Sequence, residues 1–534
     1  MAIEDPIAAG LRAGWKVIDA SRLSGDLDLE CDVAIVGTGA GGGVTAEILS
    51  GAGLSVVLLE EGPLKSSRDF RMLEADAYPQ LYQESAARKT ADKAITILQG
   101  RCVGGSTTVN WTTSFRTPPA TLAYWRARLG LDDFTEAGMQ PWFERMEQRL
   151  SIAPWETAPN ENNAVLRRGA QPLGVSTGSI RRNVKGCWNL GYCGMGCPTN
   201  AKQSMLVTAI PAALSAGARL VSLARVDRLC LAGDAVTLLE AQALDPAGIH
   251  PAAVRIRVRA RHFVLAAGAI GSPAVLLRSR TPDPHGLVGR RTFLHPTVIS
   301  AALMPQAVNG HAGAPQTIYS DHYLERDAID GPVGFKLEAP PLHPLLFGMT
   351  LQGFGARHAA LMREFAHAQV LIALMRDGFH RESEGGQVRL RDDGSPVLDY
   401  PITSVLWDAA RRALLAMAEI QFAAGARRVY PVHELATGYA SWAQAQAGIA
   451  RLGLEPVLTR VVSAHVMGGC AMASTERDGV VDARGQHWQV GNLSVHDGSV
   501  FPTSIGANPQ LSIYALAARN AMLLAQRLTG RQVA

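Results

Sequence analysis

The chain has 534 residues, of which 47% are apolar and 18% are charged, and its formal net charge at pH 7 is +4. This composition supplies enough apolar side chains for a large buried core and excludes a mainly disordered chain. The small positive charge, spread along the whole chain, argues against nucleic-acid binding. Length alone allows several small domains or one large two-part enzyme.

The sequence carries no targeting or membrane-spanning signal that we can identify. The N-terminal segment has acids at Glu4 and Asp5 and lacks the apolar run of a signal peptide. A membrane-spanning helix needs about 18 consecutive apolar residues, and no such run occurs anywhere in the sequence. The seven cysteines, an odd number, indicate reduced thiols. We therefore expect a cytoplasmic protein, and peripheral contact with a membrane stays open.

The first strong pattern is a strand, a glycine-rich turn, a helix and a second strand. Residues 32–36 are a short β-branched run, a helix is predicted from about 43 to 50, and residues 55–59 form the second strand. Both strands are apolar on both faces, which is typical of a parallel sheet covered by helices.

Gly37, Gly39 and Gly42 make the G-x-G-x-x-G fingerprint of a dinucleotide-binding loop. The first glycine permits a tight turn, the second lets the backbone approach a pyrophosphate, and the third lets helix and strand pack closely. Phosphates then lie at a helix N-terminus, where free N–H groups favour anions. Glu60 ends the second strand, where its carboxylate can accept hydrogen bonds from ribose hydroxyls and disfavours NADP. An ordinary glycine-rich turn is the alternative, and the motif alone does not separate NAD from FAD.

Similar elements recur far along the chain. A strand-like run at 263–267 opens onto a glycine-containing turn, and another at 493–497 precedes a long helical pattern from about 509 to 527. The intervening region differs. Residues 388–400 contain two strand-like runs, the first with alternating apolar and polar residues, on either side of a turn, which indicates an antiparallel sheet. We therefore predict an α/β fold in which a discontinuous Rossmann-like domain carries an inserted second domain.

The segment 100–110, Gly-Arg-Cys-Val-Gly-Gly-Ser-Thr-Thr-Val-Asn, resembles the flavin-cradling loop of the glucose–methanol–choline (GMC) oxidoreductases. Further segments resemble signatures of that family in the same order, namely residues 268–273, 286–296, 465–470 and 497–509. The resemblance extends from residue 32 to about 525. It implies the GMC fold and FAD as the cofactor.

Together, pattern and resemblance predict the domain boundaries. We expect an N-terminal arm at residues 1–30, an FAD-binding domain at 31–120, 199–297 and 461–534, and a substrate-binding domain of antiparallel sheet plus helices at 121–198 and 298–460.

The resemblance implies His465 and Asn508 as catalytic residues. Alcohol oxidation needs the hydroxyl proton removed while hydride leaves for flavin N5, and imidazole titrates in the right range for that base. A satisfied core histidine is the alternative. We expect Asn508 to bind the substrate oxygen and to cap a helix that starts at Pro509, whose positive end would stabilise a reduced flavin. His295 and His496 are expected to be structural.

FAD contacts are implied for a set of residues in the matching segments: Gly37, Gly39, Gly42, Glu60, Arg101, Gly104, Gly105, Ser106, Asn110, Val226, Ala267, Asp497, Gly498 and Pro509. Some relatives attach FAD covalently through a histidine just before the loop asparagine. That position corresponds to Val109, which has no nucleophile, so we expect non-covalent FAD.

Cys187, Cys193 and Cys197 have the spacing C-x5-C-x3-C, and three thiolates can serve as ligands of an iron–sulfur cluster. Electron-relaying relatives resemble this stretch but have adjacent paired cysteines there, whereas Trp188 follows Cys187. We therefore favour a structural turn near the FAD and expect no metal.

Residues 339–365 are rich in proline, leucine, methionine and phenylalanine. Ordinary core is the simplest interpretation. The segment would also suit an apolar funnel for a bulky hydrophobic alcohol, lined by adaptable methionines. A surface patch that touches a membrane is a third interpretation.

The sequence thus predicts FAD-dependent oxidation of an apolar alcohol, aliphatic or sterol-like, to its aldehyde or ketone. We favour a dehydrogenase with a quinone or protein as electron acceptor, although nothing in the sequence decides how oxygen reacts. The alternatives are a non-redox FAD-containing lyase of the same family and an electron-transferring flavoprotein subunit with an iron–sulfur cluster. Resemblance of fold does not name the substrate.

Overall fold

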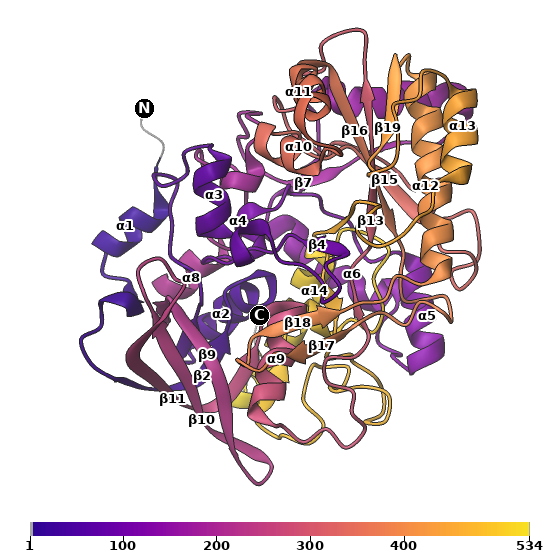
Figure 1. The fold of residues 1–534 in the computed structure, drawn as a ribbon. Coiled ribbons are helices and arrows are strands. Elements are labelled where there is room, and N and C mark those ends of the chain that lie inside the picture. Colours follow the sequence, from indigo (N-terminus) through magenta and orange to yellow (C-terminus); the bar gives the residue numbers. More distant parts are fainter. Residues whose placement is uncertain (1–3, 533–534) are drawn as a thin grey trace.

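The structure, a computed structural model, describes residues 4–532. Two eight-stranded sheets organise it, one at the lower left and one at the upper right of Figure 1. Each sheet has its own hydrophobic core against which helices pack. No helix in this part of the chain has both the length and the apolar character needed to cross a bilayer.

The first sheet runs in the order β1-β8-β3-β2-β11-β10-β9, with β22 beside β11. Its strands are β1 (Lys16–Asp19), β8 (Arg219–Ser222), β3 (Val56–Leu59), β2 (Leu27–Val36), β11 (Pro251–Leu265), β10 (Ala235–Leu244), β9 (Ala224–Ala232) and β22 (Leu493–Val495). The pairs from β1 to β11 and the β11–β22 pair are parallel, while β10 and β9 pair antiparallel. The predicted strands at both ends of the chain therefore meet in one sheet.

Helix α2 (Ala40–Gly51) packs against two other helices beside this sheet, α8 (Ala209–Ser215) and α14 (Gln510–Thr529). Helix α2 also contacts β2 and β3, as a Rossmann-like unit requires. Helix α9 (Gly268–Ser279) packs against β9.

The second sheet runs in the order β4-β20-β13-β16-β15-β14-β6, with β19 beside β13. Its strands are β4 (Ile95–Ile97), β20 (Val461–Ser463), β13 (Thr297–Leu303), β16 (Ala368–Met375), β15 (Phe335–Glu338), β14 (Ile318–Ser320), β6 (Gly178–Ser179) and β19 (Arg428–Pro431). All pairs except β4–β20 are antiparallel, as predicted for the inserted domain.

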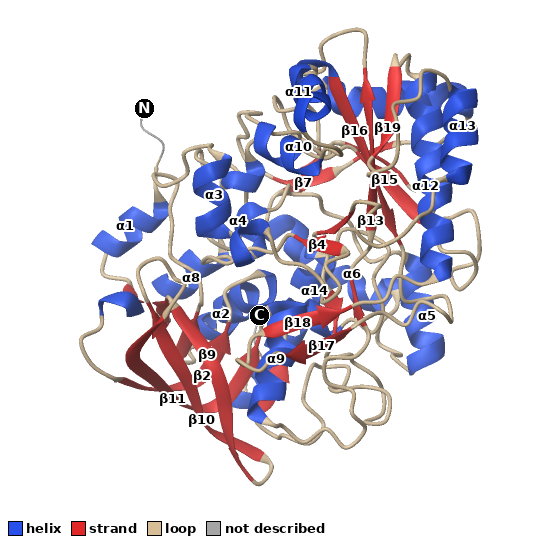
Figure 2. Ribbon diagram, viewed as in Figure 1, coloured by secondary structure: helices blue, strands red, loops and turns tan. Residues whose placement is uncertain are grey.

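Side chains alternate along β13 between two helical layers. Val298 and Ala302 belong to the core under α12 (Ser404–Ala423), which is flanked by α7 (Glu161–Ala170) and α13 (Trp442–Arg451). Ile299 and Ala301 belong to a smaller core under α10 (Pro344–Thr350). Helix α11 (Gly355–Arg363) follows α10, and Figure 2 shows both at the edge of the molecule.

The remaining elements are short pairs of strands and five further helices. The strand pairs are β12 (Thr292–Phe293) with β21 (Met467–Gly468), β17 (Gln387–Leu390) with β18 (Pro396–Asp399), and β5 (Ile152–Pro154) with β7 (Arg181–Asn183). The helices are α1 (Pro6–Arg12), α3 (Glu74–Leu81), α4 (Ser106–Val109), α5 (Pro119–Leu129) and α6 (Glu136–Arg149).

Several elements depart from the predicted division of the chain. Strand β1 and the start of β2 come from the expected N-terminal arm but lie in the first sheet, and β4 and β20 come from the expected FAD-binding segments but pair in the second. Helix α6 packs against α14 rather than with the second sheet, and the β17–β18 hairpin packs on α9. Short strands follow whichever sheet edge offers them backbone partners, and sequence pattern does not specify that choice.

Candidate active site and family

A cavity of about 520 Å³ lies where the ends of the first sheet meet the second. Most of its wall comes from the glycine-rich turn before α2, residues 98–113, the start of β9, the start of α9 and residues 497–513. All predicted catalytic and FAD-contacting residues line it except Gly42 and Gly104. Their individual roles stay predictions.

The glycine fingerprint forms the N-terminus of α2. Gly37 has φ +95°, a conformation that favours glycine, and a Cβ on Gly42 would lie 2.0 Å from the carbonyl oxygen of Gly37. At Gly39, by contrast, a Cβ would meet only the Cα of Gly105 at 3.9 Å, so this backbone faces open space. No side chain caps α2, which leaves N–H groups at its N-terminus free for an anion.

Three separate motifs are joined by hydrogen bonds around Glu60. The N–H and hydroxyl of Thr38 donate to one carboxylate oxygen of Glu60 at 3.1 and 2.6 Å, and the N–H of Gly62 donates to the other at 2.9 Å. The hydroxyl oxygen of Thr38 also accepts the N–H of Gly104 at 3.0 Å. Burial raises the pKa of Glu60 to about 6. The second glycine loop is thereby held against the first.

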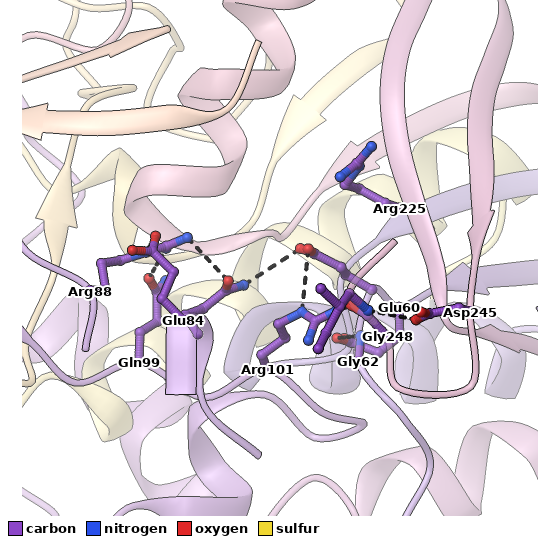
Figure 3. Close-up of polar contacts among 12 residues, drawn as sticks. Glu60, Gly62, Glu84, Arg88, Gln99, Arg101, Arg225, Asp245 and Gly248 are labelled. Atoms are coloured by element: carbon purple, nitrogen blue, oxygen red, sulfur yellow. Dashed lines mark hydrogen bonds and ion pairs between the residues drawn. The ribbon is translucent and has the colours of Figure 1, made fainter. Parts of the chain in front are cut away.

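Arg101 lies at the end of the cavity where Glu60 is found (Figure 3). Its guanidinium pairs with Glu61 at 3.3 Å and donates to the carbonyl oxygen of Gly248. Gln83 continues this chain of contacts from Glu61 to Arg88. The side chain that we expected to contact FAD is thus already engaged by protein groups on the cavity wall.

Lys202, which no sequence motif marked as functional, anchors the flavin-type loop. Its buried ammonium donates to the carbonyl oxygens of Thr108 (2.6 Å), Asn110 (2.9 Å) and Cys193 (2.7 Å). Burial lowers the pKa of Lys202 to about 8. This lysine ties the end of α4 to the cysteine-containing turn.

Asp497 connects the C-terminal segment to α9. Its carboxylate accepts the N–H of Gly268 at 2.8 Å, the hydroxyl of Ser272 at 2.6 Å and the N–H of Ser499 at 2.8 Å. Burial raises its pKa, against the effect of these donors. The adjoining Gly498 lies beside it on the cavity wall.

His465 and Asn508 meet on the cavity wall, with Nε2 of the histidine 3.4 Å from the Asn508 side-chain nitrogen. Burial, with a smaller effect of the Lys336 charge, lowers the pKa of His465 to about 4. The imidazole is therefore neutral near pH 7, the form that a base needs.

The prediction that Asn508 caps the C-terminal helix is wrong. Helix α14 begins at Gln510 after Pro509, and no side chain caps it. The Asn508 amide nitrogen donates instead to a carboxylate oxygen of Glu338 at 3.3 Å, and its side-chain oxygen has no hydrogen-bond partner among the described residues.

Two neighbours of this pair were not predicted as site residues. Glu338 is fully buried at the end of β15, accepts the Gln316 amide at 2.6 Å, and has its pKa raised to about 7 by burial. His295, expected to be structural, has its Nδ1 3.3 Å from the Nδ1 of His465 and accepts the N–H of Gly506 at its Nε2. The sequence signal for Glu338 was that two charged residues, Lys336 and Glu338, alternate with apolar residues in the segment that forms β15.

A second, apolar cavity of about 130 Å³ adjoins the first and shares His465, Trp111 and Gln316 with it. The inner side of α10 and the facing side chains of β13 and β16 line it. Residues 339–365 therefore contribute both to core and to a cavity wall, but the methionines that were expected to line it, Met349 and Met362, are not among the lining residues.

The three clustered cysteines are free thiols. The N–H of Asn189 donates to the sulfur of Cys187 at 3.4 Å, and the carbonyl of Cys193 is held by Lys202. Within residues 4–532, no group of three or more His, Cys, Asp or Glu side chains is arranged to hold a metal ion. These contacts support a structural turn that includes Cys197, beside the flavin-type loop.

The main cavity fits a dinucleotide. The uncapped start of α2 offers N–H groups to phosphates, and Glu60 lies at the end of β3. Two buried polar atoms of residues lining the cavity, Nε1 of Trp111 and Oδ1 of Asn508, have no partner among the described residues. Buried polar groups are normally hydrogen-bonded, so we expect a polar group of a ligand near Trp111 and Asn508.

Comparison with known proteins supports the same conclusion. The family models for GMC oxidoreductases match residues 78–297 and 382–517. An uncharacterised GMC-type oxidoreductase of Mycobacterium tuberculosis is 32% identical over 91% of this chain and 74% of its own length. A long-chain-alcohol oxidase of Arabidopsis thaliana is 27% identical over 97% of this chain and 70% of its length.

Among solved structures, a formate oxidase of Aspergillus oryzae, studied for its FAD modification, aligns with a TM-score of 0.70 at 16% identity, over 94% of this chain and 99% of its own. The predicted fold, cofactor and enzyme class are thereby confirmed. The chain belongs to the GMC oxidoreductase family and is an FAD-dependent oxidoreductase that acts on CH–OH groups.

Proposed function

We propose that the protein oxidises an apolar alcohol, with His465 as the base and Asn508 as the group that holds the substrate oxygen. The observation that carries this proposal is the position of His465, which lines both the FAD-sized cavity and the adjoining apolar one. A substrate whose hydroxyl reaches His465 from the apolar side would present its carbinol carbon toward the larger cavity.

The residues of the chain supply proton removal and orientation. Neutral His465 accepts the hydroxyl proton, and the Asn508 amide, 3.4 Å from its Nε2, fixes the oxygen beside it. FAD, when bound, supplies the acceptor for the hydride that leaves the carbon. We propose that it is held without a covalent bond, since Val109 offers no nucleophile.

The substrate class follows from the lining of the second cavity. The described residues that line this cavity include Leu346, Phe347, Ile299 and Val370 and no Asp, Glu, Lys or Arg. This lining offers no charged side chain that could bind a polar tail of a substrate. The name of the plant relative, a long-chain-alcohol oxidase, supports an aliphatic chain, and the oxidase names of relatives support dioxygen as acceptor in place of the quinone or protein favoured from sequence.

The test is the visible spectrum of the purified protein without air, before and after adding a medium-chain aliphatic alcohol. We expect the flavin band to bleach, then to return with formation of peroxide when air is admitted. Carbonyl formation with an unchanged flavin band would instead indicate a lyase, and return of the band only with a quinone would contradict the oxygen proposal.

His465→Ala should lower the rate of bleaching by about 10²–10⁴-fold, because a positioned base contributes about that much. His285→Ala, at an exposed histidine, is the matched control and should bleach at the original rate. Unfolding midpoint and flavin content establish that both variants are folded. Full activity of the His465 variant would refute its assignment as the base.

A further inference from the structure

Six of the twelve large apolar side chains that are exposed within residues 4–532 gather around α10. We call this the α10 patch, and it consists of Met72, Leu73, Leu345, Met349, Phe354 and Leu435. Phe354 is 91% exposed, and Leu345 and Met349 lie one turn apart on the outer side of α10. Contiguous exposed apolar surface of this kind marks an interaction site.

Hydrogen bonds between neighbouring segments make the patch continuous. The Glu74 carboxylate accepts the N–H groups of Leu345 and Leu346 at 2.6 and 2.8 Å, which places the residues just before α3 beside the start of α10. At the other end, the N–H of Gly353 donates to Glu434. Figure 1 shows α3, α10 and α11 along one side of the molecule.

Exposed arginines lie in the segments that form the α10 patch. Arg71, Arg357 and Arg363 are exposed and form no ion pair with any residue of the described chain 4–532. Two carboxylates beside the patch are engaged, since Glu74 binds the start of α10 and Glu434 pairs with Arg460 at 3.8 Å. An apolar surface with a basic rim is complementary to a bilayer interface with anionic headgroups.

One helix separates this surface from the apolar cavity. Leu346, Phe347 and Thr350 on the inner side of α10 line the cavity that contains His465, while Leu345 and Met349 on the same helix face outward. A surface that binds lipid would therefore hold the apolar cavity next to the medium in which long apolar alcohols dissolve.

We propose that the α10 patch docks the protein peripherally onto a lipid bilayer that carries anionic headgroups. The docking is inferred from the apolar side chains of the patch and the arginines beside it. A role of the docked patch in substrate delivery rests on the proposed oxidation of an apolar alcohol. Apolar side chains enter the interface, and the arginines contact the headgroups.

The experiment is co-sedimentation of the full-length holoenzyme with vesicles of phosphatidylcholine, with and without phosphatidylglycerol. We expect binding to the anionic vesicles, weakened by salt. Phe354→Ser and the double variant Leu345→Gln, Met349→Gln should lower the bound-to-free ratio at least tenfold, and Arg71→Gln and Arg363→Gln about fivefold each. Trp488→Gln, at an exposed aromatic residue outside the patch, should bind like the original protein.

Failure of the original protein to sediment with either vesicle type would overturn the proposal, as would equal loss in the Trp488 variant. A solution mass of two chains that falls to one chain in Phe354→Ser would assign the patch to a second copy of the protein. Oxidation of a water-soluble apolar alcohol, measured on the same samples without vesicles, should be unchanged in the patch variants and separates failure of docking from failure of the proposed reaction.

Discussion

At the scale of single residues, the site is shaped by buried ionisable groups that face one another. Glu338, Asn508, His465 and His295 form one connected series of contacts between 3.3 and 3.4 Å. Burial raises the pKa of the acid and lowers that of both imidazoles. All three titratable groups are therefore biased toward their neutral forms, which lowers the cost of burying them together.

The raised pKa of Glu338 should make the stability of the protein depend on pH. The pKa of about 7 in the folded protein lies above its ordinary value of 4.5, so between these values only the folded state holds the proton. The contribution of Glu338 to the free energy of unfolding is fully present below pH 4.5 and is lost as the pH rises through 7. The total loss is about 3 kcal/mol.

Glu338→Gln keeps both hydrogen-bond donors satisfied and removes the titration. Urea unfolding of both proteins from about pH 5 to 8 should show the original losing roughly 2–3 kcal/mol more than the variant. Other titrating groups are common to both proteins and cancel in the comparison. Parallel pH profiles would mean that Glu338 is ionised throughout this range.

At the scale of elements, helix α2 is positioned by close backbone contact at its first turn. A Cβ on Gly41 would lie 1.6 Å from the carbonyl oxygen of His496, which belongs to the segment after β22. Backbone cannot move aside as a flexible side chain can, so this contact fixes the helix start against the C-terminal part of the site.

Two glycines of α2 provide a matched pair. Gly41→Ala should cost about 3 kcal/mol or more, with loss of bound flavin, because the added methyl displaces the start of the helix. Gly51→Ala, at the other end of the same helix, meets nothing within 4 Å and should stabilise the protein by about 0.4–1 kcal/mol. Thermal unfolding and the flavin absorbance of the purified variants measure both effects, and equal behaviour of the two would contradict the argument.

At the scale of the whole molecule, the main cavity joins segments that are hundreds of residues apart. The start of α2, the loop before α4, the start of β9 and the segment before α14 all contribute to its wall. A ligand that contacts all of these segments binds only the folded chain, so it stabilises the assembled protein by mass action.

Removal of FAD should therefore lower the thermal midpoint, and its return should restore it. At a free FAD concentration of about 100 times its Kd, the gain should be roughly 2.7 kcal/mol. Differential scanning calorimetry of the apoprotein, the holoenzyme and the reconstituted protein measures this. A midpoint that does not depend on FAD would show that the cavity is assembled without contribution from the cofactor.

Prediction from sequence succeeded where the chain itself specifies local geometry. Gly37 and Gly42 take the turn and the close packing expected of them, and the predicted strands 32–36, 55–59, 263–267 and 493–497 all lie in the first sheet. It failed at Asn508, because the helix begins at Gln510, one residue later than predicted, and a buried acid 170 positions away binds the amide nitrogen.

The sequence by itself thus determined the dinucleotide loop, and its resemblance to the GMC family implied the fold, the cofactor and the segment that carries His465. The loop depends on contiguous residues whose backbone conformation is set within a few positions. Only the tertiary structure decided which side chains surround that histidine, which strands join which sheet, and that α10 has one side on a cavity and the other exposed. Those features arise from contacts between distant segments, and such contacts follow from packing and not from local pattern.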